Sequence, residues 1–267
     1  MELLLPQILE YFNNGIVDEY HLWVNTKDEA DINWMNEKQK EFPNFITLKL
    51  CNIDIIKPHD YIYTIGSFFK DCIDDNTIYI RFDDDVVLLD SLESFKNFLD
   101  FRIDNPEYFL IYPVILNNAI VSHILQRSGK LDYLNGIVGY SFNDDVGWGN
   151  ADFANNLHNQ VISNLNNGNT LAYYHINNWI LYYNEQVSIN CICWFGSDLR
   201  NVCDGIISLD DEEEDLSVTI PRRIGRVNCI YGGYTVVHFS FYTQRGRLDN
   251  AGVLDKYKEL LSHKLNF

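Results

Sequence analysis

Three consecutive aspartates, Asp83–Asp85, follow directly on a β-branched and aromatic run at Thr77–Phe82. Such a run predicts a strand, so the three carboxylates are expected where that strand ends. Like charges this close raise one another's pKa unless a cation lies between them. In extended backbone, Asp83 and Asp85 would point to one side and Asp84 to the other. The pattern therefore predicts a site for a hard divalent ion, Mg²⁺ or Mn²⁺, held by Asp83 and Asp85.

The alternative for this cluster is a solvated turn with a capping aspartate. The strand-like run before it and the apolar run Val86–Leu89 after it favour the metal site. An ion on two carboxylates keeps positions open for phosphate oxygens and offsets charge on a leaving diphosphate. The cluster thus predicts chemistry on a nucleoside diphosphate.

The first part of the chain alternates between strand-like and helix-like patterns. Predicted strands lie at Tyr20–Asn25, Phe45–Leu50, Thr77–Phe82 and Tyr108–Ile115, the last ending near Pro113. Predicted helices lie at Leu5–Phe12, after a capping box at Thr26–Glu29, at Ile65–Cys72 and from the Ser91 cap to Phe98. This alternation predicts an α/β fold with a mostly parallel central sheet flanked by helices. Ligands are then expected beyond the carboxyl ends of the strands.

The C-terminal part of the chain predicts a small mixed β region. Its predicted strands are Ser217–Ile220, Cys229–Tyr231 and Thr235–Phe239, and a helix follows from Val253 to Leu265. No repeat and no linker rich in proline, glycine or serine divides the sequence. We therefore expect one domain over residues 1–267.

Charge and hydropathy exclude several classes of protein. The chain has 38 acidic and 20 basic residues, a net charge of -18, which argues against a nucleic-acid or anionic-membrane partner. The six cysteines lack Cys-X-X-Cys spacing and are predicted to be reduced thiols. The segment Met1–Phe12 lacks a basic region, so it predicts an amphipathic helix rather than a signal peptide. No apolar run approaches the roughly 18 residues of a membrane span, and a cytoplasmic protein is expected.

The run Thr77–Val87 resembles the Asp-X-Asp strand of GT-A glycosyltransferases. The segment Val236–Arg245 resembles a late strand on which this class often carries a histidine, and the resemblance extends loosely from Tyr20 to Tyr257. It implies a Rossmann-like GT-A fold and transfer of a sugar from a nucleotide-diphosphate sugar to a hydroxyl of a carbohydrate or other acceptor. GT-A domains normally open with a strand before their first helix, so we expect that strand to be missing or the chain to be a shortened form.

The resemblance also implies roles for individual residues. Asp83 and Asp85 would hold the metal with His238, and Asp83 or Asp84 would also reach the ribose of the donor. Arg245 would face the diphosphate. From the residues alone, His238 is equally well a core histidine, and Arg245 a partner in a surface salt bridge.

Contacts with the nucleotide base or ribose are expected from Asn25 and Thr26, which follow the first predicted strand. These two residues would otherwise only cap the next helix. An inverting transfer needs a carboxylate near the acceptor hydroxyl, and we assign this base to Asp211 or Glu212. Their acidic run, which begins at Asp210, is otherwise a solvated loop. Further candidates for acceptor contacts are Asp144, Asp145, Trp148, Asn117 and Asn118.

Two other functions remain open. A phosphohydrolase of the haloacid-dehalogenase type would use Asp83 as nucleophile, Asp85 as acid/base, and Asp210 with Asp211 as metal ligands. That class places its first motif after the first strand, whereas at least two strand-like runs precede Asp83. The second alternative is a non-catalytic sugar-binding relative of the glycosyltransferases.

Overall fold

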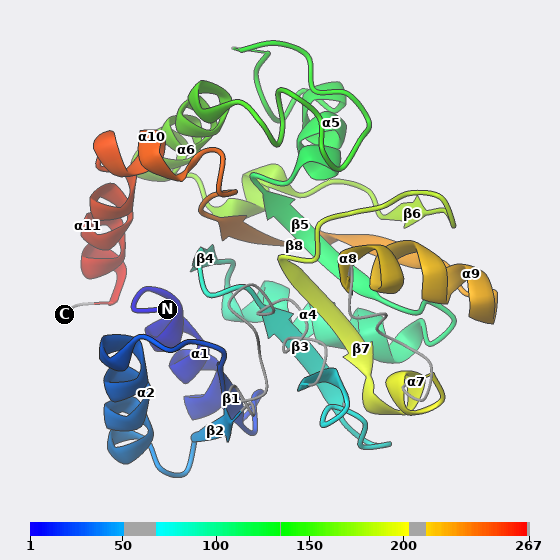
Figure 1. Cartoon of the computed structure of the whole chain (residues 1–267). Coiled ribbons are helices and arrows are strands. Elements are labelled where there is room, and N and C mark those ends of the chain that lie inside the picture. Colours follow the sequence, from blue (N-terminus) through cyan, green and yellow to red (C-terminus); the bar gives the residue numbers. More distant parts are fainter. Residues whose placement is uncertain (51–67, 134, 203–211, 266–267) are drawn as a thin grey trace. The chain divides into compact units, whose positions relative to one another are not determined.

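The structure, a computed structural model, describes residues 1–50, 68–133, 135–202 and 212–265. It is a mixed α/β protein with a multi-stranded sheet flanked by helices (Figure 1). The chain divides into two compact units. The first unit comprises Met1–Leu5, Ile80–Cys193 and Leu216–Phe267, and the second comprises Pro6–Tyr79 and Trp194–Asp215. The single domain stays a prediction.

A six-stranded sheet lies mostly in the first unit. The order of its strands is β3 (Ile78–Phe82), β7 (Cys191–Phe195), β5 (Ile111–Leu116), β8 (Asn228–His238) and β4 (Val86–Leu89), with β6 (Trp179–Leu181) paired to β8. β5 and β8 run parallel, whereas β4 and β6 run antiparallel to β8 and β7 runs antiparallel to β5. The prediction of a mostly parallel sheet is therefore wrong. The alternation of strands and helices along the chain did not specify which strands pair. Of the four pairings just given, only that of β5 with β8 is parallel.

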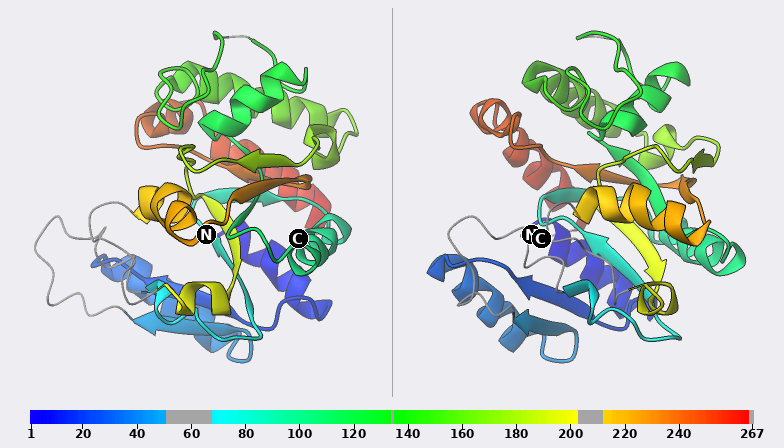
Figure 2. Two further views of the ribbon diagram at one scale, coloured as in Figure 1. Left: turned by 90° about the vertical axis from the view of Figure 1, so that its right-hand side faces the viewer. Right: turned by 45° about the vertical axis from the view of Figure 1, so that its right-hand side comes forward.

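The helices of the first unit pack on both sides of this sheet. In the left view of Figure 2, the green helices α5 and α6 lie above the strands, whereas the teal helix α4 lies at their right-hand side. The helical segments are α4 (Leu92–Asp104), α5 (Ala119–Arg127), α6 (Ala151–Asn166), the 3₁₀ turn η2 (Leu171–Tyr174), the π-helical turn η3 (Asp215–Thr219), α9 (Ile220–Ile224), α10 (Arg245–Asn250) and α11 (Val253–Leu265). None of the helices in the described ranges combines the length and the apolar character needed to cross a membrane.

Two predicted elements change in this unit. Ser217–Ile220 is helical instead of a strand, because a four-residue run is too short for its apolar pattern to separate the two states. The two predicted strands at Cys229–Tyr231 and Thr235–Phe239 form one strand, β8. Ser91 caps α4 as predicted, with its side chain accepting from Ser94 N–H.

Pro113 lies inside β5, where the sequence predicted the end of the strand. The register between β5 and β8 shifts at this point: Tyr112 pairs with Ile230, whereas Val114 pairs with Thr235. Proline has no N–H to donate to a neighbouring strand. The regular pairing is interrupted at Pro113, and β5 pairs with β8 on both sides of the proline.

The second unit contains a parallel pair of short strands, with α2 packed against both. Its elements are α1 (Leu4–Asn13), which begins in the first unit, β1 (Tyr20–Val24), α2 (Glu29–Glu41), β2 (Ile46–Leu50), α7 (Gly196–Arg200) and α8 (Glu212–Glu214). The cap of α2 is Asp28, which accepts from Ala30 N–H, so the predicted capping box at Thr26 is wrong. The predicted helix at Ile65–Cys72 lies partly outside the described residues, and Phe68 and Phe69 within it are helical.

Candidate metal centre

The polar residues of the candidate site lie at one edge of the first unit's sheet, where β3, β5 and β8 end and β4 and β7 begin. β3 and β4 are the outermost strands in the sheet order, yet only Asp83–Asp85 separate them along the chain. The three aspartates therefore run across the ends of the strands between them. The main chain turns here, since Val86 N–H donates to the Asp83 carbonyl at 3.2 Å.

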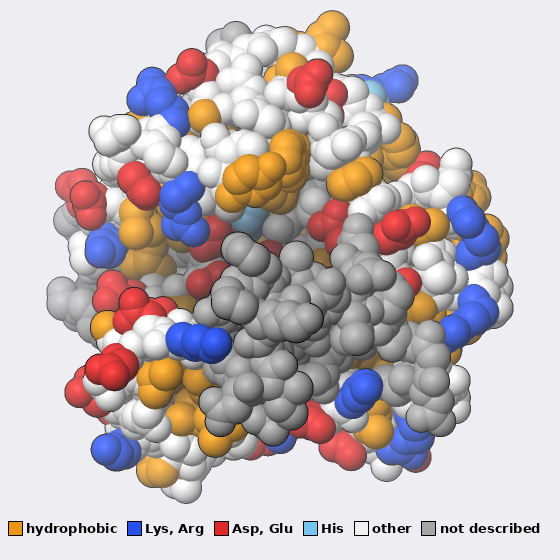
Figure 3. Space-filling model, viewed as in Figure 1, with side chains coloured by type: hydrophobic (Ala, Val, Ile, Leu, Met, Phe, Trp, Pro, Cys, Tyr) orange, Lys and Arg blue, Asp and Glu red, His pale blue; other side chains and the backbone are white. Residues whose placement is uncertain are grey.

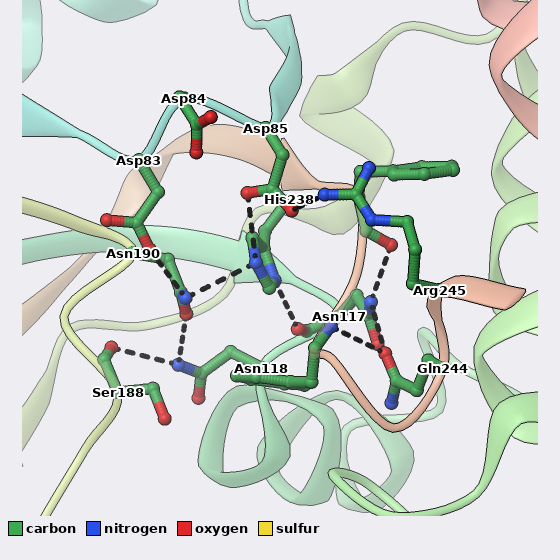
Figure 4. Close-up of polar contacts among 12 residues, drawn as sticks. Asp83, Asp84, Asp85, Asn117, Asn118, Ser188, Asn190, His238, Gln244 and Arg245 are labelled. Carbon is green, nitrogen blue, oxygen red and sulfur yellow. Dashed lines mark hydrogen bonds and ion pairs between the residues drawn. The ribbon is translucent and has the colours of Figure 1, made fainter. Parts of the chain in front are cut away.

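This turn changes the geometric argument made from the sequence. Asp83 and Asp85 are not alternate residues of an extended strand, because the strand ends at Phe82. The turn and the meeting of several strand ends bring their side chains together (Figure 4). The cluster is thus a turn and also a convergent group of carboxylates, so the two interpretations of the sequence were not exclusive.

Asp83, Asp85 and His238 form a group that could hold a metal ion. Each offers one ligand atom, and these atoms all lie within 4.8 Å of one another. His238 is almost fully buried, and its Nε2 lies 3.3 Å from Asp85 Oδ1. The histidine reaches the aspartates because β4 pairs antiparallel with β8, with Val86 opposite His238.

The surroundings of His238 determine which ring nitrogen faces the carboxylates. Its Nδ1 lies 3.1 Å from the carbonyl oxygen of Asn117, and a carbonyl oxygen can only accept. Nδ1 therefore carries a proton, and in the neutral ring the lone pair is on Nε2, the atom next to Asp85. A backbone carbonyl on the second nitrogen is the usual partner of a metal-binding histidine.

The charges of Asp85 and His238 stabilise each other. Burial would raise the pKa of Asp85, but the hydrogen bond and charge of His238, with the charge of Arg245, lower it below its ordinary value. Burial would lower the pKa of His238, but the hydrogen bond and charge of Asp85 raise it above its ordinary value.

Two arginines form ion pairs with the carboxylates of the site, Arg245 with Asp85 and Arg81 with Asp83. Arg245 Nη2 is 3.2 Å from Asp85 Oδ2, and its guanidinium carbon lies 4.9 Å from the ring centre of Phe239. Arg81 Nη2 is 3.0 Å from Asp83 Oδ1. Arg245 is the more exposed of the two arginines.

Asp84 has a different environment from its two neighbours. Loss of solvent around the carboxyl group and the negative charge of Asp85 raise its pKa above the ordinary value. Burial is the larger of these causes, and the charge of Asp85 adds the repulsion between neighbouring carboxylates that the sequence predicted. The pKa of Asp85 moves the other way, so the predicted rise does not extend to all three aspartates.

Asn190 is a residue of the site that the sequence analysis missed. Its Nδ2 donates to Asp83 Oδ2 at 3.0 Å and lies 3.4 Å from His238 Nε2. Asn190 directly precedes β7. A residue at the start of one strand lies beside the carboxyl ends of the neighbouring strands only if that strand runs antiparallel to them. The assumption of a mostly parallel sheet therefore concealed it.

The predicted acceptor contacts Asn117 and Asn118 are buried and take part in holding the fold. Asn117 Nδ2 donates to the Phe239 carbonyl and to Gln244 Oε1, both at 2.9 Å. Asn118 caps α5 by accepting from Val121 N–H. Their side-chain amides therefore hold the ends of β5 and β8 and the start of α5, and their binding of an acceptor stays a prediction.

Aromatic side chains lead outward from His238. The ring of Phe241 packs edge-on against the ring of His238, with 4.9 Å between the ring centres. The ring centre of Trp148 lies 6.0 Å from that of Phe241 and 5.3 Å from that of Tyr242. Tyr242 is 81% exposed. Figure 3 shows hydrophobic side chains beside acidic, basic and histidine side chains on one face of the molecule.

Asp144 braces the loop that carries Trp148. Its Oδ1 accepts from the N–H groups of Val146 and Gly147 at 2.9 and 2.8 Å, and its Oδ2 accepts from Gly139 N–H. These bonds account for Asp144 without a role in acceptor binding.

The other predicted site residues belong to the second unit or lie outside the described residues. Thr26 Oγ1 accepts from Asp28 N–H and donates to Asp31, and Asn25 N–H donates to the Trp23 carbonyl. Glu212 begins α8, in the second unit. Asp210 and Asp211 lie outside the described residues. The roles assigned to Asn25, Thr26, Asp211 and Glu212 stay predictions.

Comparisons with protein-family models, with curated protein sequences and with solved structures found no match to this chain.

Proposed function

We propose that this protein is a metal-dependent glycosyltransferase of the GT-A type, which transfers a sugar from a nucleotide-diphosphate sugar to an acceptor hydroxyl. One observation carries the proposal. Asp83, Asp85 and the Nε2 atom of His238 converge at the strand-end edge of the sheet, with Arg245 bound to Asp85. His238 lies far along the sequence from the two aspartates, and the sequence predicted all three as metal ligands.

The donor set fits Mn²⁺ or Mg²⁺. Asp83 and Asp85 offer hard oxygen ligands, and His238 offers a neutral imidazole nitrogen whose tautomer the Asn117 carbonyl determines. Mg²⁺ prefers oxygen ligands, so the imidazole favours Mn²⁺. When bound, the ion would neutralise negative charge on a leaving diphosphate.

The charges of the site support a diphosphate as the anionic ligand. The negative charges of Asp83 and Asp85 are balanced by Arg81 and Arg245 in the structure, and the charge of Asp84 is balanced by the nearby amino group of Met1. A divalent ion would leave an excess of two positive charges, which a diphosphate group would offset. Arg245, with 46% of its side chain exposed, is the arginine placed to meet that group.

The aromatic residues next to His238 support a carbohydrate acceptor. Phe241, Trp148 and Tyr242 form a contiguous group in which the outermost ring is exposed. Aromatic rings present an apolar face with polar atoms at the edge, and sugar rings have complementary faces and hydroxyls. In this proposal Asp211 or Glu212 is the general base, and Asn25 and Thr26 contact the nucleoside.

The haloacid-dehalogenase alternative has less support. It gives no role to His238, although this buried histidine lies 3.3 Å from Asp85. The metal ligands that it requires, Asp210 and Asp211, lie outside the described residues. A non-catalytic sugar-binding protein would retain the aromatic group but has no need of the metal centre.

A thermal-shift screen with UDP, GDP, CDP and their sugars, each with and without Mn²⁺, tests the proposal. We expect one nucleoside diphosphate to raise the melting temperature only when Mn²⁺ is present, because a ligand that binds the folded state stabilises it. Asp85→Ala should lose that shift and all turnover while melting cooperatively. Asp100→Ala, which removes an exposed carboxylate of α4, is the control for the change in net charge.

The alternatives predict different results in this screen and in turnover assays. Turnover of p-nitrophenyl phosphate would support the phosphohydrolase. Metal-dependent nucleotide-sugar binding without turnover would support the non-catalytic relative. No response to any nucleotide, with or without Mn²⁺, would refute the proposed donor site.

A further inference from the structure

The side chain of Asp83 is held on both oxygens. Arg81 donates to Oδ1, and Asn190 Nδ2 donates to Oδ2, each at 3.0 Å. The main chains of Asp83 and Asn190 are also joined, since Asp83 N–H donates to the Asn190 carbonyl at 2.9 Å. Asn190 is 5% exposed, so its amide lies in a buried position against one carboxylate of the candidate metal centre.

Asn118 determines which way the Asn190 amide faces. Asn118 Oδ1 accepts from Val121 N–H in the first turn of α5, so its Nδ2 points the other way, toward the Ser188 carbonyl at 3.1 Å and Asn190 Oδ1 at 3.2 Å. A backbone N–H can only donate and a backbone carbonyl can only accept. The Asn118 amide therefore has one satisfied orientation. It forces Asn190 to direct its oxygen to Asn118 and its nitrogen to Asp83.

The hydrogen bonds that link Val121, Asn118, Asn190 and Asp83 all point in one direction. The donors run from Val121 N–H to Asn118, from Asn118 to Asn190 and from Asn190 to Asp83 (Figure 4). Hydrogen bonds aligned in this way polarise one another. The chain starts at the N-terminus of α5, where the helix carries partial positive charge, and ends on a carboxylate.

We infer that Asn190, oriented by Asn118, is a positioning residue for Asp83 in the proposed metal centre. The inference rests on the proposed function for the identity of the bound ion. Asn190 presents its nitrogen to Asp83 and His238, so it is a donor to the ligand residues and is itself excluded from the metal. Its N–H group holds the Asp83 carboxylate directed at the position that Asp83 shares with Asp85 and His238 before the ion arrives. Partners of this kind are worth about 10- to 100-fold in metal affinity.

The inference differs from a purely structural role for two buried amides. A structural role predicts that variants lose stability and keep their metal affinity. A positioning role predicts a loss of affinity in the variants that fold. It also predicts that Asn118 acts only through Asn190.

Mn²⁺ titrations of the full-length protein, with electron paramagnetic resonance as the readout, test whether Asn118 and Asn190 position Asp83. We expect Asn190→Ala and Asn118→Ala each to weaken Mn²⁺ binding by about 10-fold or more. The double variant should bind no more weakly than Asn190→Ala, because the second residue acts through the first. Ser122→Ala, which removes a buried hydroxyl from the same helix, is the matched control and should retain wild-type affinity.

Asn190→Asp keeps the shape of the side chain if the alanine variants do not fold. It replaces the donor by a third carboxylate beside Asp83, so the metal-free protein should melt at a lower temperature and bind Mn²⁺ more tightly than wild type. Unchanged Mn²⁺ affinity in both Asn190→Ala and Asn190→Asp would overturn the inference. The inference would also be overturned if the loss of Mn²⁺ affinity in the double variant equalled the product of the losses in Asn118→Ala and Asn190→Ala.

Failure of the proposed function gives a different result. If the wild-type protein does not bind Mn²⁺, the metal centre is refuted. The coupling of Asn118 to Asn190 is then tested by urea unfolding of the wild type, the two single alanine variants and their double variant. Non-additive losses of stability for Asn118→Ala and Asn190→Ala would support this coupling without the metal. Additive losses would overturn it.

Discussion

At the scale of single residues, Asn117 connects the backbone to the chemistry of the site. It is the one residue other than glycine in the described ranges with a positive φ, at 64°. Its carbonyl oxygen faces His238 Nδ1, while its side chain bonds the Phe239 carbonyl and Gln244. Asparagine tolerates this left-handed conformation better than most residues. The backbone conformation of one residue thus determines which histidine nitrogen faces the carboxylates.

This conformation predicts an unusual order of stabilities at position 117. Both Asn117→Gly and Asn117→Ala lose the side-chain hydrogen bonds, but only alanine also pays the steric cost of positive φ, about 1 kcal/mol. We expect the glycine variant to be the more stable of the two in urea unfolding. At Ser122, inside α5, the order should reverse, since glycine is the poorer helix former by about 1 kcal/mol. The same order at both positions would contradict this account.

His158 predicts a loss of stability in acid. It is fully buried, with Nδ1 2.9 Å from the Tyr257 hydroxyl and Nε2 2.8 Å from the Phe239 carbonyl. Burial lowers its pKa to about 4, below the unfolded value of roughly 6.5. A lowered histidine pKa means that the unfolded chain binds the proton first, so stability is complete above pH 6.5 and falls toward pH 4.

The expected loss between pH 7.5 and pH 5 is about 2 kcal/mol. Urea unfolding at the two pH values measures it. His158→Gln can donate to the same carbonyl and accept from the same hydroxyl without titrating. This variant should lose about 2 kcal/mol less than wild type over that range, and an equal loss in both proteins would assign the acid sensitivity to other groups.

At the scale of secondary-structure elements, α4 and β8 are joined by stacked rings. Phe98 lies 5.1 Å from Tyr234 in a stacked arrangement, and Phe95 lies 5.5 Å from the same ring. Phe98 is fully buried, whereas Ile103 on the same helix is 55% exposed. The helix therefore presents one face to the strand that carries His238.

Truncation on the two faces of α4 should have very different costs. Phe98→Ala removes a buried ring and leaves a cavity, which typically costs about 3–5 kcal/mol. Ile103→Ala should stay within about 0.5 kcal/mol of wild type, because its side chain is half in solvent. Chemical unfolding of both variants measures the difference, and similar costs would show that the burial of this face is misassigned.

At the scale of the whole molecule, the net charge of -18 affects how ligands arrive. A negative surface attracts Mn²⁺ and repels a nucleoside diphosphate at long range, and added salt screens both effects. Raising ionic strength from about 20 to 200 mM should speed association of the nucleoside diphosphate and slow that of Mn²⁺. Stopped-flow measurements at several salt concentrations test this. An uncharged nucleoside is the control, and slower diphosphate binding at high salt would contradict the prediction.

The sequence by itself determined those features that depend on neighbours along the chain. The strand before Asp83, the Ser91 cap of α4 and the acidic surface follow from local pattern and composition. The mixed sheet did not, because pairing between distant segments depends on how β-strands pack after loops close. The resemblance to GT-A glycosyltransferases predicted His238 as a metal ligand. Only the antiparallel register of β4 and β8 places this histidine beside Asp85. In the same way, only the pairing of β7 brings Asn190 to Asp83, since no spacing in the sequence relates a residue before one strand to a residue after another.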